Sequence, residues 1–561
     1  GRKRKKVLPL DSFGKKKLVL CLTVSIAILV LLVIRIGVLQ FVQGADLKKR
    51  AVKGQMSSKT IEPSRGTIYD STGKALAISA KVDTVSVNPT QIKFSGDVKL
   101  DNTVLAHAFS DIFELDYDET LEKLNTKTSS FVLARKVEND KITLLENWKK
   151  ENKLISGITV TEEINRYYPY NNLASNLIGF TGTEGSGSAG LEYSLNDILT
   201  GTPGKVLALT DSVNSEIPNT QQTYVKAQDG SNVVLTIDVN IQSIAEKYLS
   251  QAVQDNNADG GNVLIMNPSN GDVLAMATYP DYNLNEPYTI NTPELKEVWD
   301  TLSSEEKSNE WYNMWKNKAV QDTYEPGSTF KIITAAAGLE EGLLTTDNTS
   351  DFYCAGSEEV LGIRMNCWRH SNPHGAESLR NALENSCNPA FIQLGRKLSA
   401  PTLYKYYSGF GLFDRTSKYF YGESNSVFFD KDNINEFNLA TMSFGQRFTI
   451  TPIQLITAIS AVANEGVLME PRIVKEIRNP NTGATTVVEP KSVRQVISKE
   501  TADSLMNMLQ SVVTDGTGKY AQVPGYSVGG KTGTSEPLYD TDNGYVASMI
   551  AMSPTVNTQV V

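Results

Sequence analysis

Three short strings of residues in this chain could together carry out nucleophilic catalysis by a serine. In chain order they are Ser328-Thr329-Phe330-Lys331, Ser386-Cys387-Asn388 and Lys531-Thr532-Gly533-Thr534. A serine hydroxyl is a weak nucleophile unless a base takes its proton, and a lysine whose pKa is lowered by burial can be that base. Each string alone is common, since Ser-x-x-Lys also begins at Ser12, Ser71 and Ser304. The three strings in order predict serine acyl transfer.

The residues around the first string predict a helix that brings its serine and lysine together. Pro326-Gly327 interrupts regular structure, and the alanine-rich run after Lys331 favours a helix. Ser328 is therefore expected in the first helical turn, with Lys331 on the same face one turn away. The N–H groups of a helix N-terminus also stabilise the negative charge that develops during nucleophilic attack.

The third string is expected to lie on the edge of a strand. Gly529-Gly530, directly before Lys531, permits the close approach of another backbone segment. A lysine and hydroxyl groups on such an edge can hold a substrate carboxylate. The backbone N–H of Thr534 could form an oxyanion hole together with that of Ser328.

The ordered strings resemble the motifs of the penicillin-binding protein and serine β-lactamase superfamily. Further stretches resemble the class B penicillin-binding proteins of the septal and sporulation-type branch. These stretches are Arg65-Gly66-Thr67-Ile68-Tyr69-Asp70, Gly73-Lys74-Ala75-Leu76-Ala77, Arg166-Tyr167-Tyr168-Pro169, Gly190-Leu191-Glu192, 325–331 and Gly516-Thr517-Gly518. One position departs from the family pattern: Arg447 stands where the family usually has glycine. This arginine would narrow or recharge the cleft, or simply lie at the surface.

The resemblance implies a peptidoglycan D,D-transpeptidase that β-lactams inhibit. Ser328 would attack the carbonyl between two D-alanines of a stem peptide, and Lys331 would take the hydroxyl proton. Ser386 would relay a proton to the leaving amine, tuned by Lys531, while Asn388 binds the substrate amide. The substrate-binding residues would be Thr532, Gly533 and Thr534, whose hydroxyl groups hold the terminal carboxylate.

Two other functions stay open for the same motifs. A β-lactamase or D,D-carboxypeptidase would pass the acyl group to water, and the membrane segment and the large region before the motifs argue against it. A catalytically silent, membrane-anchored scaffold or sensor could keep the same fold. The presence of Ser328, Lys331 and Lys531 argues against a silent site.

Scarce cysteines and histidines gather in one stretch beside the second string. The chain has 4 Cys and 3 His, and Cys354, Cys367, His374 and Cys387 would form a closed Cys₃His site for a structural zinc ion. A disulfide is the ordinary outcome outside the cell, but it would leave one cysteine over; unrelated free thiols are a third possibility. The resemblance also implies a metal site here, with His374 and Cys387 similar to its later ligands, and His370 is the weaker candidate.

The N-terminus reads as a membrane anchor. Residues 1–17 are rich in lysine and arginine, and residues 18–42 are almost entirely apolar, which is long enough to cross a bilayer. Positive charge before a spanning segment predicts a cytoplasmic tail and a single-pass protein in the cell membrane. The catalytic domain would then be extracellular.

The rest of the chain predicts an α+β multidomain protein. Residues 43–230 are expected to form an elongated α+β pedestal of the dimerisation type, with helices near 118–125 and 140–152. Residues 231–561 are expected to form a domain like those of serine β-lactamases and transpeptidases, with an antiparallel sheet flanked by helices. Its first hairpin is predicted from residues 262–277. Relative to the family pattern, this domain looks truncated at its C-terminus.

Composition narrows the choice of partners. The net charge is −9 despite the basic tail, so the part after the anchor is acidic and nucleic-acid binding has no support. The expected partners are peptidoglycan stem peptides, β-lactams and the membrane. Family analogy adds a SEDS-type glycosyltransferase and a divisome-like complex.

Overall fold

The computed structural model describes residues 12–47, 56–92, 98–127, 129–154, 156–182, 184–209, 223–535 and 544–561. The chain divides into two compact units, one with residues up to Pro63 together with Thr202–Gln228, and one with Ser64–Gly201 together with Asp229–Val561. Each unit is described by itself. The predicted boundary after residue 230 remains a prediction, and the second unit contains residues from both sides of it.

The first unit contains the apolar N-terminal helix. Helix α1 spans Ser12–Gly37 and continues into the π-helix η1, Val38–Val42. Among the described residues, only this helical stretch, Lys16–Val42, is long and apolar enough to cross a membrane. It fits the predicted single-pass anchor. The unit also holds an antiparallel sheet in the order β1-β6-β7, formed by Met56–Ile61, Gly204–Leu209 and Thr223–Val225.

The second unit is organised by a seven-stranded mixed sheet whose strands come from distant parts of the chain. Its order is β17-β16-β8-β2-β3-β4, with β5 also paired to β3. The strands are β17 Thr485–Val487, β16 Val474–Arg478, β8 Asn232–Leu235, β2 Ile68–Tyr69, β3 Ala75–Val87, β4 Phe131–Val137 and β5 Ile158–Tyr167. Strands β2 and β8 are parallel, while the other pairs are antiparallel. The sheet therefore joins the region before residue 201 to the region after residue 229, which carries the three motif strings.

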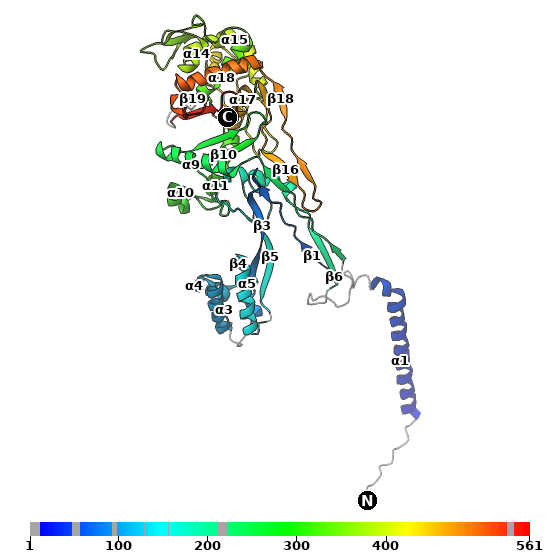
Figure 1. Cartoon of the computed structure of the whole chain (residues 1–561). Helices are drawn as coiled ribbons and strands as arrows, with labels where there is room; N and C mark the ends of the chain where they lie inside the picture. The colour runs from blue at the N-terminus through cyan, green and yellow to red at the C-terminus, as the bar shows by residue number, and fades with distance from the viewer. Residues whose placement is uncertain are drawn as a thin grey trace. The chain divides into compact units, whose positions relative to one another are not determined.

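Three helices pack on the end of this sheet formed by β3, β4 and β5 (Figure 1). They are α3 Val98–Phe113, α4 Tyr117–Thr126 and α5 Asn139–Glu151. Their apolar faces enclose a core of their own around Leu105, Phe109 and Leu145. Helices α4 and α5 confirm two predicted helices, and α3 was not predicted.

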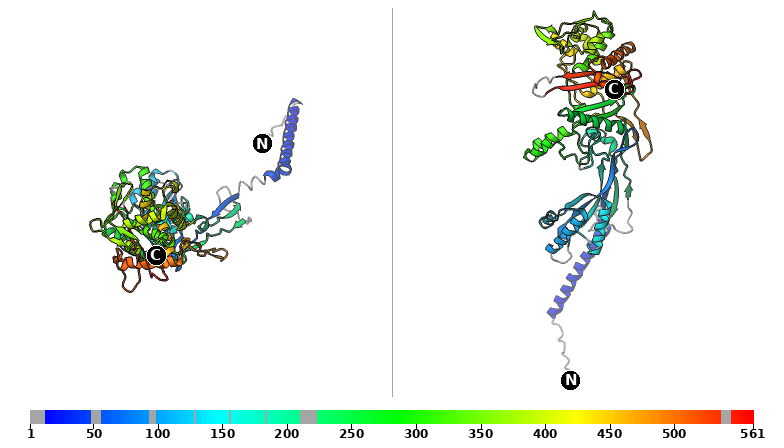
Figure 2. Two further views of the ribbon diagram at one scale, coloured as in Figure 1. Left: turned by 90° about the horizontal axis from the view of Figure 1, so that it is seen from above. Right: turned by 60° about the vertical axis from the view of Figure 1, so that its left-hand side comes forward.

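The region that carries the three motif strings combines antiparallel strand pairs with buried helices, as expected. The predicted hairpin is β9 Gly261–Met266 paired with β10 Val273–Tyr279, and β19 Gly529–Ser535 pairs with β20 Val546–Met552. Helix α18, Lys499–Thr514, packs against β19, and Figure 2 shows this orange helix beside the red strand pair. Helix α17, Pro452–Ala463, is buried along almost its whole length.

Candidate active site

A short turn places Ser328 at the start of a buried helix. Residues Gly327–Phe330 form the 3₁₀ turn η4, and helix α13 follows directly as Lys331–Glu340. Phe330 anchors the turn because its fully buried ring meets the rings of Tyr407 and Phe448 at 5.0 and 4.6 Å. Ser328 is only partly buried, so its hydroxyl stays within reach of a substrate.

The side chain of Lys331 brings the first two strings together. Its Nζ donates hydrogen bonds to Asn388 Oδ1 at 2.7 Å, to Ser386 O at 2.8 Å and to Ser386 Oγ at 3.3 Å. The ammonium group also lies 5.3 Å from the centre of the Phe391 ring. Lys331 is therefore held in one position between Ser328, three residues before it, and the second string.

Both lysines of the motifs are fully buried, and burial changes their chemistry. Desolvation lowers the pKa of Lys331 to about 7, and the electrostatic influence of Cys387, Cys367 and Glu377 partly opposes this shift. Burial and the charge of Lys331 hold the pKa of Lys531 well below its usual range. The Nζ of Lys531 binds Thr532 O at 3.0 Å. A neutral Lys331 amine at neutral pH can accept a proton from a hydroxyl group.

Strand β19 carries the third string and touches the turn of the nucleophile. A Cβ atom added at Gly327 would lie only 2.7 Å from Thr534 O and 3.4 Å from Thr534 N. One added at Gly533 would lie 3.0 Å from Pro326 O. This packing brings the backbone of Thr534 beside the turn that carries Ser328, and the oxyanion hole formed by their N–H groups stays a prediction. Farther along, Thr532 Oγ1 meets Thr517 Oγ1 at 3.5 Å.

Gly445 supports the nucleophile turn from the other side. Its carbonyl accepts a hydrogen bond from Gly327 N at 2.9 Å, its φ angle is +89°, and a Cβ atom there would lie 2.0 Å from Gly327 O. We expect Gly445→Ala to lower both the free energy of unfolding and the rate of acylation by a penicillin. Backbone strain at positive φ alone costs about 1–2 kcal/mol, and the displaced turn adds to it.

Gly483 provides a matched control for this change. It also has a positive φ angle, +73°, but no atom lies within 4 Å of an added Cβ. Gly483→Ala should therefore show the strain cost in chemical denaturation without a change in acylation rate. Equal acylation rates for the two variants would contradict a role of Gly445 in shaping the turn.

The second string lies in a tight loop between two helices. Helix α14, Leu379–Glu384, ends just before Ser386, whose φ angle of +53° turns the chain sharply. Cys387 then precedes helix α15, Asn388–Gly409, and its N–H donates to Ala382 O at 3.0 Å. The left-handed residue directs Ser386 Oγ and Asn388 Oδ1 to the same amine of Lys331.

The predicted metal ligands converge beside this loop. Donor atoms of Cys354, Cys367, His374 and Cys387 all lie within 4.8 Å of one another, and Cys367 Sγ is 3.6 Å from His374 Nδ1. The ligands of a tetrahedral zinc ion lie roughly 3.7 Å apart, so the set fits such an ion. All four side chains are buried, and the cysteines are free thiols. A metal ion would bind the three cysteines as thiolates and His374 as a neutral imidazole.

A disulfide would use only two of the three thiols and would not account for the histidine beside them. Cys354 ends strand β11, Phe352–Cys354, which pairs with β14, Gly375–Glu377, directly after His374. Trp368 Nε1 donates a hydrogen bond of 2.7 Å to Asn385 O, which connects the residue after Cys367 to the loop that contains Ser386. The cluster can therefore bind a metal ion.

Glu377 was missed by the sequence reasoning. Its side chain is 1% exposed, with Oε1 3.7 Å from His374 Nδ1 and 2.8 Å from Asn385 Nδ2. Glu377 is also one of the negative charges that raise the pKa of Lys331 against the effect of burial. A single glutamate in a short strand gives no sequence signal that it lies beside His374 or that it affects the pKa of Lys331.

Arg447 lies at the surface. Its guanidinium group lies 4.6 Å from the centre of the Phe437 ring, and its backbone N–H donates to the buried Glu325 carboxylate at 3.0 Å. Its φ angle of +64° explains why glycine would suit this position. Of the two possibilities for Arg447, the structure agrees with an arginine at the surface.

Comparisons with known proteins match this architecture along nearly the whole chain. The penicillin binding protein transpeptidase domain matches residues 261–561, and the penicillin-binding protein dimerisation domain matches residues 60–235. Stage V sporulation protein D of Bacillus subtilis is 33% identical over 556 residues, covering 98% of this chain and 81% of the relative. Peptidoglycan D,D-transpeptidase FtsI of Escherichia coli K12 is 27% identical over 525 residues, covering 93% and 81%.

Solved structures also resemble this chain over about 90% of its length. A peptidoglycan synthetase from Bifidobacterium adolescentis superposes with a TM-score of 0.66 at 26% identity, covering 90% of this chain and 91% of that one. Penicillin Binding Protein 2X from Streptococcus thermophilus superposes with a TM-score of 0.70 at 22% identity, covering 90% and 76%, and supports the fold. With a dimerisation domain ahead of a transpeptidase domain, the chain belongs to the class B penicillin-binding proteins.

Proposed function

We propose that this protein is a serine D,D-transpeptidase that cross-links peptidoglycan stem peptides and is inhibited by β-lactams. The observation that carries the proposal is the buried Lys331 amine, bound to Ser386 and Asn388 and one turn from Ser328. Relatives named peptidoglycan D,D-transpeptidase support the reaction, and the relative named stage V sporulation protein D supports a role in sporulation.

The first half-reaction forms an acyl-enzyme. Ser328 Oγ attacks the carbonyl carbon between two D-alanines while its proton passes to the neutral Lys331 amine. The backbone N–H groups of Ser328 and Thr534 stabilise the oxyanion. The peptide C–N bond then breaks, a proton reaches the leaving amine through Ser386, tuned by Lys531, and D-alanine departs. The hydroxyl groups of Thr532 and Thr534, with Gly533 between them, hold its carboxylate, and Asn388 binds the peptide amide.

The second half-reaction forms the cross-link. An amine from a neighbouring stem peptide attacks the ester carbonyl of Ser328, and the new C–N bond replaces the C–O bond. The proton of the amine returns through the Lys331–Ser386 pair to Ser328 Oγ, which restores the free enzyme. Water in place of the amine would make the protein a carboxypeptidase or β-lactamase, while a penicillin stops at the first half-reaction.

Intact-protein mass spectrometry during incubation with a penicillin tests this function. A single adduct on Ser328 that persists for hours is expected, and the Ser328→Ala variant should form none. Rapid loss of the adduct would instead identify a β-lactamase. Failure of the folded, metal-replete protein to form an adduct would favour the silent scaffold.

The acylation rate should rise with pH through about 7. Lys331 must be neutral to accept the Ser328 proton, and burial lowers its pKa to about 7, so protonation below that pH removes the base. Stopped-flow acylation by a chromogenic cephalosporin between pH 5.5 and 8.5 measures this. A rate that falls as the pH rises through 7 would contradict Lys331 as the base.

We further propose that Cys354, Cys367, His374 and Cys387 bind a structural zinc ion. Their buried, tetrahedrally compatible donor set supports zinc, which favours thiolate and imidazole ligands. Such an ion would tie Cys387, and with it the Ser386 loop, to strand β11. It would hold the loop in place and supply no reacting group.

The membrane arrangement completes the proposal. The basic residues before helix α1 favour a cytoplasmic N-terminus, which puts the catalytic domain outside the cell, where peptidoglycan lies. A SEDS-type glycosyltransferase in a divisome-like complex is the partner that the family suggests. Co-purification of the full chain from membranes would test this partner.

A further inference from the structure

Ser386 has a backbone conformation that serine rarely adopts. Its φ angle of +53° lies in the left-handed region, which is costly for every residue except glycine. Such a conformation persists only where the surrounding structure holds it in place. Because the peptide bond is planar, rotating the peptide plane between Asn385 and Ser386 changes this φ angle directly. Whatever fixes that plane therefore fixes the conformation of Ser386.

The carbonyl oxygen of Asn385, which belongs to this peptide plane, is bound by a side chain from outside the loop. Trp368 Nε1 donates a hydrogen bond to it at 2.7 Å. The Trp368 side chain is 62% exposed, and its ring lies against the ring of His374, with ring centres 5.9 Å apart. The next carbonyl along the chain, Ser386 O, accepts a hydrogen bond from Lys331 Nζ at 2.8 Å. Side chains therefore hold the peptide groups on both sides of Ser386.

The side chain of Asn385 gives the loop a second connection to the same part of the fold. Its Nδ2 donates to Glu377 Oε1 at 2.8 Å, and the Glu377 side chain is 1% exposed. Glu377 lies in strand β14, where it pairs with Phe352 of strand β11. Asn385 is therefore held through both its backbone and its side chain by residues that lie outside the three motif strings.

We infer that Trp368 is a positioning residue for Ser386, an inference that rests on the proposed function. Its hydrogen bond to Asn385 O keeps the peptide plane before Ser386 in the orientation that the left-handed conformation requires. In this conformation Ser386 Oγ lies 3.3 Å from Lys331 Nζ, within hydrogen-bond reach of the amine. Without the indole N–H, the loop would spend part of its time in a relaxed conformation that takes Ser386 Oγ away from Lys331.

Acylation of the full-length, metal-replete protein in detergent micelles by a chromogenic cephalosporin tests this role. Trp368→Phe keeps an aromatic ring but removes the N–H donor, and it should lower the acylation rate about fivefold, the effect of one typical hydrogen bond. The same change in a Ser386→Ala background should alter the rate by less than about twofold, because Trp368 acts only through Ser386. Elemental analysis should find the parent's metal content in both Trp368→Phe proteins.

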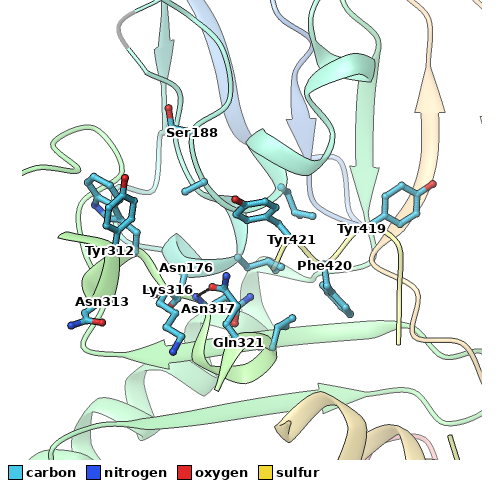
Figure 3. A pocket seen from close by; sticks show the side chains of 16 residues that line it. Asn176, Ser188, Tyr312, Asn313, Lys316, Asn317, Gln321, Tyr419, Phe420 and Tyr421 are labelled. Carbon is cyan, nitrogen blue, oxygen red and sulfur yellow. Dashed lines mark hydrogen bonds between the residues drawn. The ribbon is translucent and has the colours of Figure 1, made fainter. Parts of the chain in front are cut away.

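Trp315→Phe is the matched control. Trp315 Nε1 also donates to a backbone carbonyl, Pro287 O, at 2.6 Å. Trp315 lines a cavity of about 390 Å³, and the described residues around this cavity include Tyr312, Lys316 and Gln321 but none from the three motif strings (Figure 3). The control variant therefore loses the same kind of hydrogen bond and should acylate at the parent rate.

Hydrogen–deuterium exchange in peptides that cover residues 383–388 measures the loop without any reaction. Exchange there should be faster in Trp368→Phe than in the parent, and unchanged in Trp315→Phe. An exchange rate or an acylation rate of Trp368→Phe equal to the parent's would overturn the inference. An equal slowing of acylation in the Ser386→Ala background would also overturn it, since it would indicate a general structural effect. A parent protein that forms no adduct would refute the transpeptidase alone, because exchange still reports the loop.

Discussion

Replacing Lys331 with methionine is expected to lower the rate of penicillin acylation about 10²–10⁴-fold, the usual contribution of a general base. Methionine keeps the unbranched, apolar part of the side chain in its fully buried position but has no amine. The hydrogen bonds to Ser386 and Asn388 are lost at the same time. Stopped-flow acylation and intact mass measure the rate and the adduct on Ser328.

Controls separate chemistry from folding in this experiment. Lys247→Met removes an exposed lysine on helix α9, Val239–Asp255, and should acylate at the parent rate. The thermal unfolding of Lys331→Met should remain cooperative, because removing an amine buried at a cost in free energy need not destabilise the protein. A cooperatively folded Lys331→Met variant that acylates at the parent rate would exclude this lysine as the base.

Loss of the metal is expected to slow acylation about 10²-fold. The proposed ion connects Cys387 to Cys354, and Cys387 is flanked by Ser386 and Asn388 of the active site. A shift of about 1 Å in such groups can cost about 10²-fold in rate. Cys354→Ala removes a ligand far from the active-site string in sequence, so elemental analysis should show loss of metal together with slower acylation.

Cys21, in the apolar N-terminal helix, provides the matched control for Cys354→Ala. Cys21→Ala removes an exposed thiol in helix α1 and should change neither metal content nor acylation rate. Rapid chelation of the parent protein, followed by acylation and then by metal addition, tests the same link without mutation. Metal-free protein that acylates at the full rate would mean that the cluster does not position the Ser386 loop.

Local chemistry in this site was predictable from the sequence because it depends on near neighbours. The break at Pro326-Gly327 followed by an alanine-rich run predicted the turn and helix that hold Ser328 and Lys331. The clustering of scarce residue types predicted that three cysteines and His374 meet. Likewise, the capping of helix α9 by Asp238 follows from its place before the helix.

Contacts between distant segments were not predictable in this way. Nothing near Gly445 indicates that its carbonyl binds Gly327, and nothing near Gly533 indicates that it packs against Pro326. These contacts depend on tertiary packing, which propensity and periodicity do not encode. Helix α3 is a different case, since Leu105, Phe109 and Phe113 recur at four-residue spacing and would have predicted it.

The parallel pairing of β2 with β8 limits how this protein can be cut for production. Ile68 and Tyr69 lie beside Val233 and Val234, and Asp70 accepts a hydrogen bond from Val239 N at 3.1 Å. An expressed fragment that starts near residue 231 would present one side of β8 as a bare, apolar strand edge, which is a template for aggregation. Soluble catalytic material therefore calls for a fragment that keeps the chain from Ser64 onward.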